Sequence, residues 1–240
     1  MSSVSGKAPA DYDEVIKAEK ERIERNLEFV KNGVEFVDIR SAYIDEDVTI
    51  GKGTLICPCV TLEGSVRIGS DCVIGQNTRI VDSEIGDRTS VQSSVITESK
   101  VGSDTTVGPF AYMRPNSTVG DGCKVGDFVE IKNSSMGDGA KAAHLTYIGD
   151  SDVGKKVNLG CGVVFVNYDG SKKYRSNVED GAFIGCNSNL VSPVNIGEGA
   201  YIAAGSTITE DVPAGALYID RGKGAVLDGW VEKKGILKKK

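Results

Sequence analysis

The sequence has 240 residues and a formal net charge of −6, which argues against nucleic acid or an anionic membrane surface as a general partner. Hydrophobic residues make up 40% of the chain and aromatic residues only 6%, so the core must be narrow and mainly aliphatic. No apolar run approaches about 18 residues, and residues 1–10 lack the apolar centre of a signal peptide. We therefore expect one elongated, cytoplasmic domain.

A helix is predicted at about residues 11–32, within an N-terminal extension of residues 1–41. Its apolar side chains follow helical spacing: Ile16, Ile23, Leu27 and Val30. Asp11 and Glu14 stand three residues apart, as in a capping box, and Gly33 supplies a stop. We interpret this segment as a helix that packs against the rest of the chain.

Residues 42–212 are dominated by a repeat of six residues. Apolar residues recur at this spacing in two long runs: Ile50, Ile56, Leu62, Ile68 and Ile74, then Val101, Val107, Met113, Val119, Val125 and Ile131. A second small or aliphatic residue follows each of these after four positions, so two residues in six point inward. A helix repeats at about 3.6 residues and a simple strand at about 2, whereas a sustained hexad is typical of a solenoid of short strands.

The fold class predicted from this repeat is an all-β solenoid of roughly nine coils. The hexads resemble those of the left-handed parallel β-helix, in which three hexads form one triangular coil. That resemblance, and not the spacing, implies the left hand, which runs against the usual right-handed crossover. The 30 glycines supply residues for the tight corners.

The six cysteines lie at positions 57, 59, 72, 123, 161 and 186. Cys72 and Cys123 fall on inward hexad positions and are expected to be small buried residues in a reducing compartment. The Cys57-Pro58-Cys59 pair has no second cysteine pair and no histidine near it, so we expect no zinc site.

The repeat is interrupted once and then ends. Residues 166–177 form a polar, cation-rich loop, and loops on rigid scaffolds often carry function, although a tolerated surface insertion is the alternative. Residues 213–240 form a tail that closes in three lysines, which we interpret as a solvated end.

Two cations should stand one above the other in this solenoid. Arg114 and Lys132 each follow an inward residue by one position and lie 18 residues apart, one coil, on the same face. Two outward cations so close would repel unless an anion lay between them, which indicates a phosphate or carboxylate site. The alternative is a pair of solvated surface cations.

His144 is the only histidine and occupies the third position of its hexad. Counting coils forward, with the loop replacing one hexad, places Cys161, Cys186 and Ala204 at the same position on the same face. A histidine at the base of a column of small residues is suited to a slender ligand that lies along the solenoid.

Several separate motifs resemble, in the right order, the acetyltransferase half of the bifunctional glucosamine-1-phosphate acetyltransferase and N-acetylglucosamine-1-phosphate uridylyltransferase family. They are Gly108 to Pro115 (GPFAYMRP), Phe128 to Lys132 (FVEIK), His144 to Tyr147 (HLTY), Asn158, and Asn167 to Gly170 (NYDG). The resemblance covers roughly residues 25–222. It implies a homotrimer of left-handed β-helices with active sites between subunits. It also implies transfer from acetyl-CoA to the amino group of glucosamine 1-phosphate, a cell-wall precursor, without a catalytic metal.

The resemblance implies a role for each matching residue. His144 would be the general base, and a neutral imidazole suits this at cytoplasmic pH. The implied substrate-binding residues are Arg114, Lys132 and Lys173 for the phosphate, and Tyr147, Asn158, Asn167 and Tyr168 for the sugar. The implied acetyl-CoA groove is lined by Cys161, Cys186, Ala204 and Arg221. Glu130 would orient the ammonium group or be a plain surface carboxylate.

The chain also departs from the family pattern. The uridylyltransferase half is missing, and Ala143, Cys161 and Cys186 replace the usual Gly, Ala and Ser. These changes leave open an acetyltransferase of another amino sugar. A catalytically silent trimeric scaffold or regulatory subunit is the alternative from a different class. A γ-class carbonic anhydrase is excluded because it needs three histidine ligands.

Overall fold

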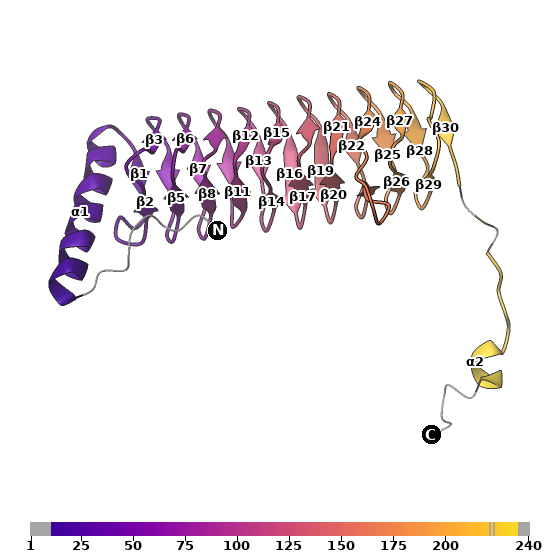
Figure 1. The fold of residues 1–240 in the computed structure, drawn as a ribbon, viewed down its shortest axis with the longest axis horizontal. Helices are drawn as coiled ribbons and strands as arrows, with labels where there is room; N and C mark the ends of the chain where they lie inside the picture. Colours follow the sequence, from indigo (N-terminus) through magenta and orange to yellow (C-terminus); the bar gives the residue numbers. More distant parts are fainter. Residues whose placement is uncertain (1–10, 221, 223, 235–240) are drawn as a thin grey trace.

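Short parallel strands, each of two to four residues, wind into a solenoid of about ten coils (Figure 1). The structure is a computed structural model that describes residues 11–220, 222 and 224–234. Successive strands fall on three sheets, of 11, 10 and 9 strands, and every pairing between strands is parallel. The chain is thus a left-handed parallel β-helix, as expected, with one coil more than the count of hexads suggested.

The three sheets run the length of the solenoid. Sheet A contains β1 (Glu35–Phe36), β4 (Leu55–Ile56), β7 (Val73–Ile74), β10 (Ser90–Val91), β13 (Thr106–Val107), β16 (Lys124–Asp127), β19 (Lys141–His144), β22 (Asn158–Leu159), β25 (Phe183–Ile184), β28 (Tyr201–Ile202) and β30 (Leu217–Tyr218). Sheet B contains β2 (Tyr43–Ile44), β5 (Thr61–Glu63), β8 (Arg79–Val81), β11 (Val95–Thr97), β14 (Tyr112–Met113), β17 (Glu130–Lys132), β20 (Tyr147–Gly149), β23 (Val164–Val166), β26 (Asn189–Val191) and β29 (Thr207–Ile208). Sheet C contains β3 (Thr49–Ile50), β6 (Arg67–Ile68), β9 (Glu84–Ile85), β12 (Ser99–Val101), β15 (Ser117–Val119), β18 (Ser135–Met136), β21 (Ser151–Val153), β24 (Ser176–Val178) and β27 (Asn195–Ile196).

The inward residues of the hexads form one continuous core. All the residues of the two predicted runs are buried except Ile50, which lies in an early coil and is only partly covered. Cys72 and Cys123 are buried, as expected. Polar inward residues bond to the next coil: the Thr54 hydroxyl donates to the Gly69 carbonyl at 2.8 Å and accepts from the Cys72 N–H at 3.0 Å. The core therefore tolerates hydroxyls because each finds a partner between coils.

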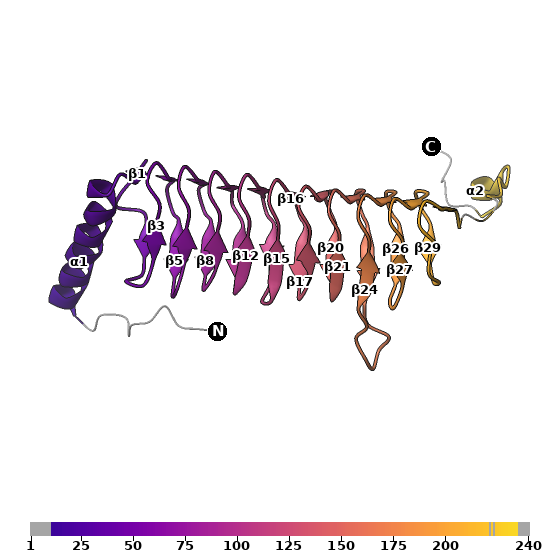
Figure 2. The same ribbon diagram turned by 90° about the horizontal axis from the view of Figure 1, so that it is seen from above.

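The loop projects from the solenoid between β23 and β24 (Figure 2). An antiparallel bridge between Tyr168 and Lys173 closes it. Beyond residue 212, β30 still pairs with β28, so coil-to-coil bonding continues into the segment that the sequence analysis assigns to a tail. A short helix, α2 (Trp230–Lys233), follows, and the terminal lysine run lies outside the described residues.

Helix α1 (Tyr12–Lys31) lies at the N-terminal end of the solenoid (Figure 1). Its N-terminus is capped as predicted, because the Asp11 carboxylate accepts from the Glu14 N–H at 2.9 Å. Within the described residues, neither helix is long and apolar enough to cross a membrane.

Helix α1 packs largely through polar side chains. The apolar stripe is largely exposed, Ile16 by 37% and Leu27 by 44%, whereas Arg22 and Asn26 are buried. Arg22 donates to the carbonyls of Arg40 and Ala42, and Asn26 donates to those of Ile39 and Ala42. The segment that enters the first coil presents these carbonyls to the helix, and they require donors that an apolar stripe cannot supply.

We expect Asn26→Ala to loosen α1. The change removes donors to two carbonyls, at a cost of about 1–3 kcal/mol, so the amides of α1 should lose protection in hydrogen exchange. Leu27→Ala is the matched control, and it should change stability by no more than about 0.5 kcal/mol because the side chain is exposed. The packing described here would be wrong if Leu27→Ala loosened the helix more than Asn26→Ala.

Candidate functional site

Strand pairing in sheet A places His144 in a column of outward side chains. Ala142 pairs with Leu159, Leu159 with Ile184, and Ile184 with Ile202. Two residues beyond these four stand His144, Cys161, Cys186 and Ala204. We call these four residues, with Asp127 one coil earlier, the sheet A column. Cys161 is half-buried, and Cys186 and Ala204 are exposed, so the column offers a shallow strip of small side chains.

The glycines beside this column are required by close approach of the coils. A Cβ on Gly160 would lie 2.6 Å from the Cys186 nitrogen, and one on Gly185 would lie 2.4 Å from the Ala204 nitrogen. Ala143, where the resembled family has glycine, is half-buried and carries its methyl group. The strip therefore stays open along its length while the backbones pack tightly beneath it.

Asp127 contacts His144 and was not found from the sequence. The two pair across β16 and β19, and His144 Nδ1 lies 2.6 Å from Asp127 Oδ1. The hydrogen bond to the imidazole lowers the pKa of the Asp127 carboxyl from its usual value. Counting one coil back from His144 would have found Asp127, because the two residues stand 17 positions apart.

Arg114 and Lys132 stand in one column of sheet B, as predicted, but each already has an anionic partner. Arg114 Nη1 is 2.9 Å from Glu130 Oε1, and Lys132 Nζ is 3.1 Å from Asp150 Oδ2. Because carboxylates of the chain pair with both cations, their stacking does not by itself require a bound anion.

Lys173, from the loop, joins these cations. It lies beside Lys132, and the hydrogen-bonding contact with that side chain, followed by its charge, lowers the pKa of the Lys173 ammonium. The cluster contains three cationic side chains, Arg114, Lys132 and Lys173, and two carboxylates, Glu130 and Asp150. The cluster therefore keeps a net positive charge, which favours an anionic ligand.

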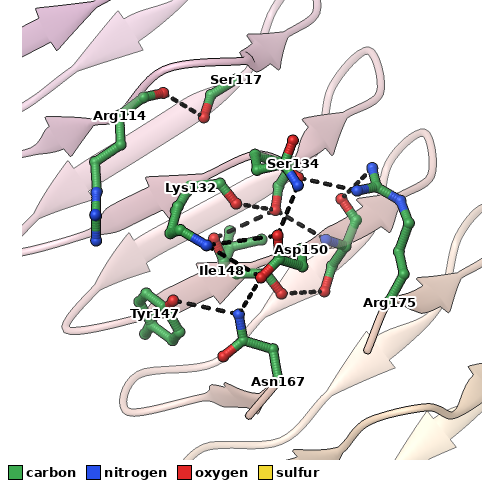
Figure 3. A network of polar contacts seen from close by, with 12 residues as sticks. Arg114, Ser117, Lys132, Ser134, Tyr147, Ile148, Asp150, Asn167 and Arg175 are labelled. Atoms are coloured by element: carbon green, nitrogen blue, oxygen red, sulfur yellow. Dashed lines mark hydrogen bonds and ion pairs between the residues drawn. The ribbon is translucent and has the colours of Figure 1, made fainter. Parts of the chain in front are cut away.

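Asp150 is the centre of the polar contacts on sheet B (Figure 3). It is 8% exposed and accepts from Lys132 Nζ, from Asn133 Nδ2 at 2.6 Å and from Asn167 Nδ2 at 2.5 Å. Burial alone would raise the pKa of this carboxyl, but these hydrogen bonds outweigh it and the pKa is lowered. Tyr147 completes the group, with its hydroxyl 3.4 Å from Asn167 Nδ2. No feature of the hexad pattern marks Asp150, because it occupies a corner with φ of 48°.

Arg175 fixes the base of the loop from the opposite side of Asp150 (Figure 3). Its guanidinium donates two hydrogen bonds to the Asp152 carboxylate, and Nη1 donates to the Asn133 carbonyl at 3.0 Å. Both ends of the loop are thus tied to sheets B and C, which holds Lys173 over the cluster. The loop is cation-rich in sequence, but no pattern there marks Arg175 as the residue that ties it to the solenoid.

The remaining predicted residues do not converge on this cluster. Asn158 lies on sheet A, three positions before Cys161. Tyr168 is exposed, and its hydroxyl donates to the Gly170 carbonyl at 2.7 Å within its own loop. Arg221 lies outside the described residues. Among the residues that the structure describes, no group of three His, Cys, Asp or Glu side chains is arranged to hold a metal ion.

An apolar edge separates the sheet A column from the cluster on sheet B. Phe110, Phe128 and Leu145 occupy successive corners with positive φ, and each is more than half exposed. The rings of Phe110 and Phe128 stack with centroids 5.5 Å apart. His144 and Tyr147 stand on the two sides of this edge, three residues apart. In a single chain the site is therefore open to solvent along an exposed apolar ridge.

Comparison with known proteins identifies relatives of the whole solenoid. The family model described as "Bacterial transferase hexapeptide (six repeats)" matches residues 47–82, 98–133 and 175–210. The chain is 57% identical over 222 residues to "Bifunctional protein GlmU" of Clostridioides difficile (strain 630), which aligns 92% of this chain with 48% of the relative. It is 58% identical over 208 residues to the protein of that name from Alkaliphilus oremlandii (strain OhILAs), covering 87% of this chain and 46% of the relative. The chain spans about half the length of the curated relatives it matches.

A solved structure shares the fold. The Arabidopsis UDP-N-acetylglucosamine acyltransferase superposes with a TM-score of 0.51 at 19% identity, over 72% of this chain and 68% of that one.

We expect Asp150→Ala to release the loop. Lys132, Asn133 and Asn167 would lose a shared acceptor, and hydrogen bonds to a charged group are each worth about 1.5–3 kcal/mol. Trypsin should then cleave after Lys172 or Lys173 at least about tenfold faster, since about 1.4 kcal/mol corresponds to a factor of ten. The matched control is Asp138→Ala, which removes an ion pair with Lys155 at another corner and should leave loop cleavage unchanged. Equal cleavage in the two variants would contradict this account of the loop.

Proposed function

We propose that this chain, which the hexapeptide transferase model matches over residues 47–82, 98–133 and 175–210, transfers an acetyl group from acetyl-CoA to the amino group of glucosamine 1-phosphate. The observation that carries the proposal is His144, hydrogen-bonded to Asp127 and standing between a strip of small side chains and a net positive cluster. The resembling motifs supply the identity of the two substrates.

In this proposal His144 is the general base. Its Nδ1 is engaged by Asp127, which leaves Nε2 to take a proton from the attacking amine. The amine nitrogen bonds to the thioester carbonyl carbon, the carbon–sulfur bond breaks, and the proton held on Nε2 passes to the departing sulfur, so that CoA leaves as a thiol. Backbone N–H groups near Cys161 would stabilise the tetrahedral oxyanion, a contribution that can reach about 3 kcal/mol.

The positive cluster would bind the sugar phosphate. Arg114 uses only Nη1 on Glu130, so the other guanidinium N–H groups remain for a phosphate, while Lys132 and Lys173 supply charge. Tyr147 and Asn167 lie beside these cations and would bind sugar hydroxyls. We assign Asn158 and Tyr168 to the sugar as well, from the resemblance.

Acetyl-CoA would lie along the sheet A column. Cys161, Cys186 and Ala204 would line its groove, with Arg221 assigned from the resemblance. The slender pantetheine arm suits a strip on which the side chains are small and the coils stand about 4.8 Å apart.

We place the complete site between copies of the chain in a homotrimer. The exposed ridge of Phe110, Phe128 and Leu145 borders the site, and a neighbouring chain that covered it would exclude water from the reaction. Sugar-binding residues that do not converge within one chain, such as Asn158 and Tyr168, could then meet ligand from two subunits.

The test is an acceptor panel with acetyl-CoA as donor. We expect glucosamine 1-phosphate to give the highest kcat/KM, and glucosamine without phosphate to be much poorer because the cations lose their partner. His144→Ala should lower kcat by about 10²- to 10⁴-fold with CoA binding retained. Preference for a different amino sugar would correct the acceptor, and absence of turnover with every acceptor would favour the scaffold function.

A second prediction concerns the groove. If Cys161 and Cys186 line it, saturating CoA should protect both thiols from alkylation, and their modification should block acetyl transfer. Cys59 is exposed in an early coil and is the internal control, which CoA should leave reactive. Mass-spectrometric mapping measures all three sites in one sample. Labelling of Cys161 and Cys186 that ignores CoA would place the groove elsewhere.

A further inference from the structure

The contact between Asp127 and His144 is built into the backbone. Each residue ends its strand, β16 or β19, directly before a corner residue with positive φ, Phe128 at 56° and Leu145 at 47°. The Leu145 N–H donates to the Asp127 carbonyl at 2.9 Å, which ties the two strand ends together. The side chains therefore leave neighbouring coils from equivalent positions and in the same direction.

An ionised carboxylate only accepts hydrogen bonds, so its partner nitrogen must carry a proton. Of the two neutral tautomers of His144, only the one protonated at Nδ1 can donate to Asp127 Oδ1 across the 2.6 Å contact. In that tautomer Nε2 holds the lone pair and is directed away from Asp127. A general base needs this lone pair, because a ring protonated at Nε2 cannot accept the amine proton there.

We infer that Asp127 is a positioning residue for the acetyl transfer, and that it holds His144 in the tautomer with the proton on Nδ1 and the lone pair on Nε2. The inference rests on the proposed function of His144. In this inference His144 remains the base and Asp127, one coil earlier, orients it. Asp127 itself does not contact the substrate.

Stability does not explain the pair. His144 is 54% exposed and Asp127 38%, and exposed pairs of this kind add little to folding. Lys124 is the other charged group that acts on Asp127, through its charge and without a hydrogen bond. Removing the Asp127 charge should therefore leave a folded protein whose histidine has lost an acceptor that cannot also donate.

The experiment uses the full chain with ¹⁵N-labelled histidine, since His144 is the only histidine and its ring signals need no assignment. Asp127→Asn keeps the size of the side chain, but its amide can donate to Nδ1 as well as accept from it, so the bias toward protonated Nδ1 is lost. We expect the wild type to show protonated Nδ1. In the variant we expect a shift toward protonated Nε2 and a kcat at least about tenfold lower, with KM for both substrates within about twofold.

Asp104→Asn is the matched control. Asp104 forms an inter-coil ion pair with Arg88 across 16 residues, away from the sheet A column, so kcat and the histidine spectrum should stay unchanged. A wild-type kcat in Asp127→Asn would overturn the inference, and so would a wild-type histidine protonated at Nε2 or a loss of kcat without a change of tautomer. His144→Ala separates the two proposals: if it keeps full activity, the proposed base is wrong, whereas its inactivity beside an active Asp127→Asn refutes only the role of Asp127.

Discussion

Coil-to-coil hydrogen bonding is the constraint on which the rest of this molecule depends. Apart from those at the ends, each strand pairs with strands one coil before and one coil after it. A sequence separation of 16 to 18 residues in most coils, and of 25 across the loop, becomes direct contact, as for Ser90 with Thr106 and Asn158 with Phe183. Residues far apart in the chain are thereby stacked into straight columns about 4.8 Å apart. The sheet A column and the cation pair on sheet B are both products of this one rule.

The same rule explains how much the sequence revealed. The solenoid, its inward residues and the column from His144 to Ala204 could all be predicted, because hexad counting needs only local spacing and each slip of register would expose apolar residues. Asp127 could have been found in the same way, one coil before His144. It was missed because the count ran only forward from the histidine.

The polar partners were harder to foresee. Asp150 sits at a corner, and Asn167 and Arg175 belong to a loop, where no period fixes the direction of a side chain. The pairing of Arg114 with Glu130 and of Lys132 with Asp150 was likewise not predicted, because only the cations of this face were considered. Helix α1 shows the same limit. Its apolar stripe predicted a helix, but the carbonyls of the first coil decided that Asn26 would face inward.

The solenoid places the proposed donor site on sheet A and the proposed acceptor site on sheet B, and the two are held in different ways. The strip on sheet A is set by backbone spacing, so cysteines at positions 161 and 186 would change the shape of the proposed groove without moving the coils. The cluster on sheet B instead depends on side-chain contacts at Asp150 and on the loop tied by Arg175. His144 stands at the edge where these two surfaces meet. Its orientation must therefore come from the fixed side, and Asp127, on the neighbouring strand of sheet A, is the group placed to supply it.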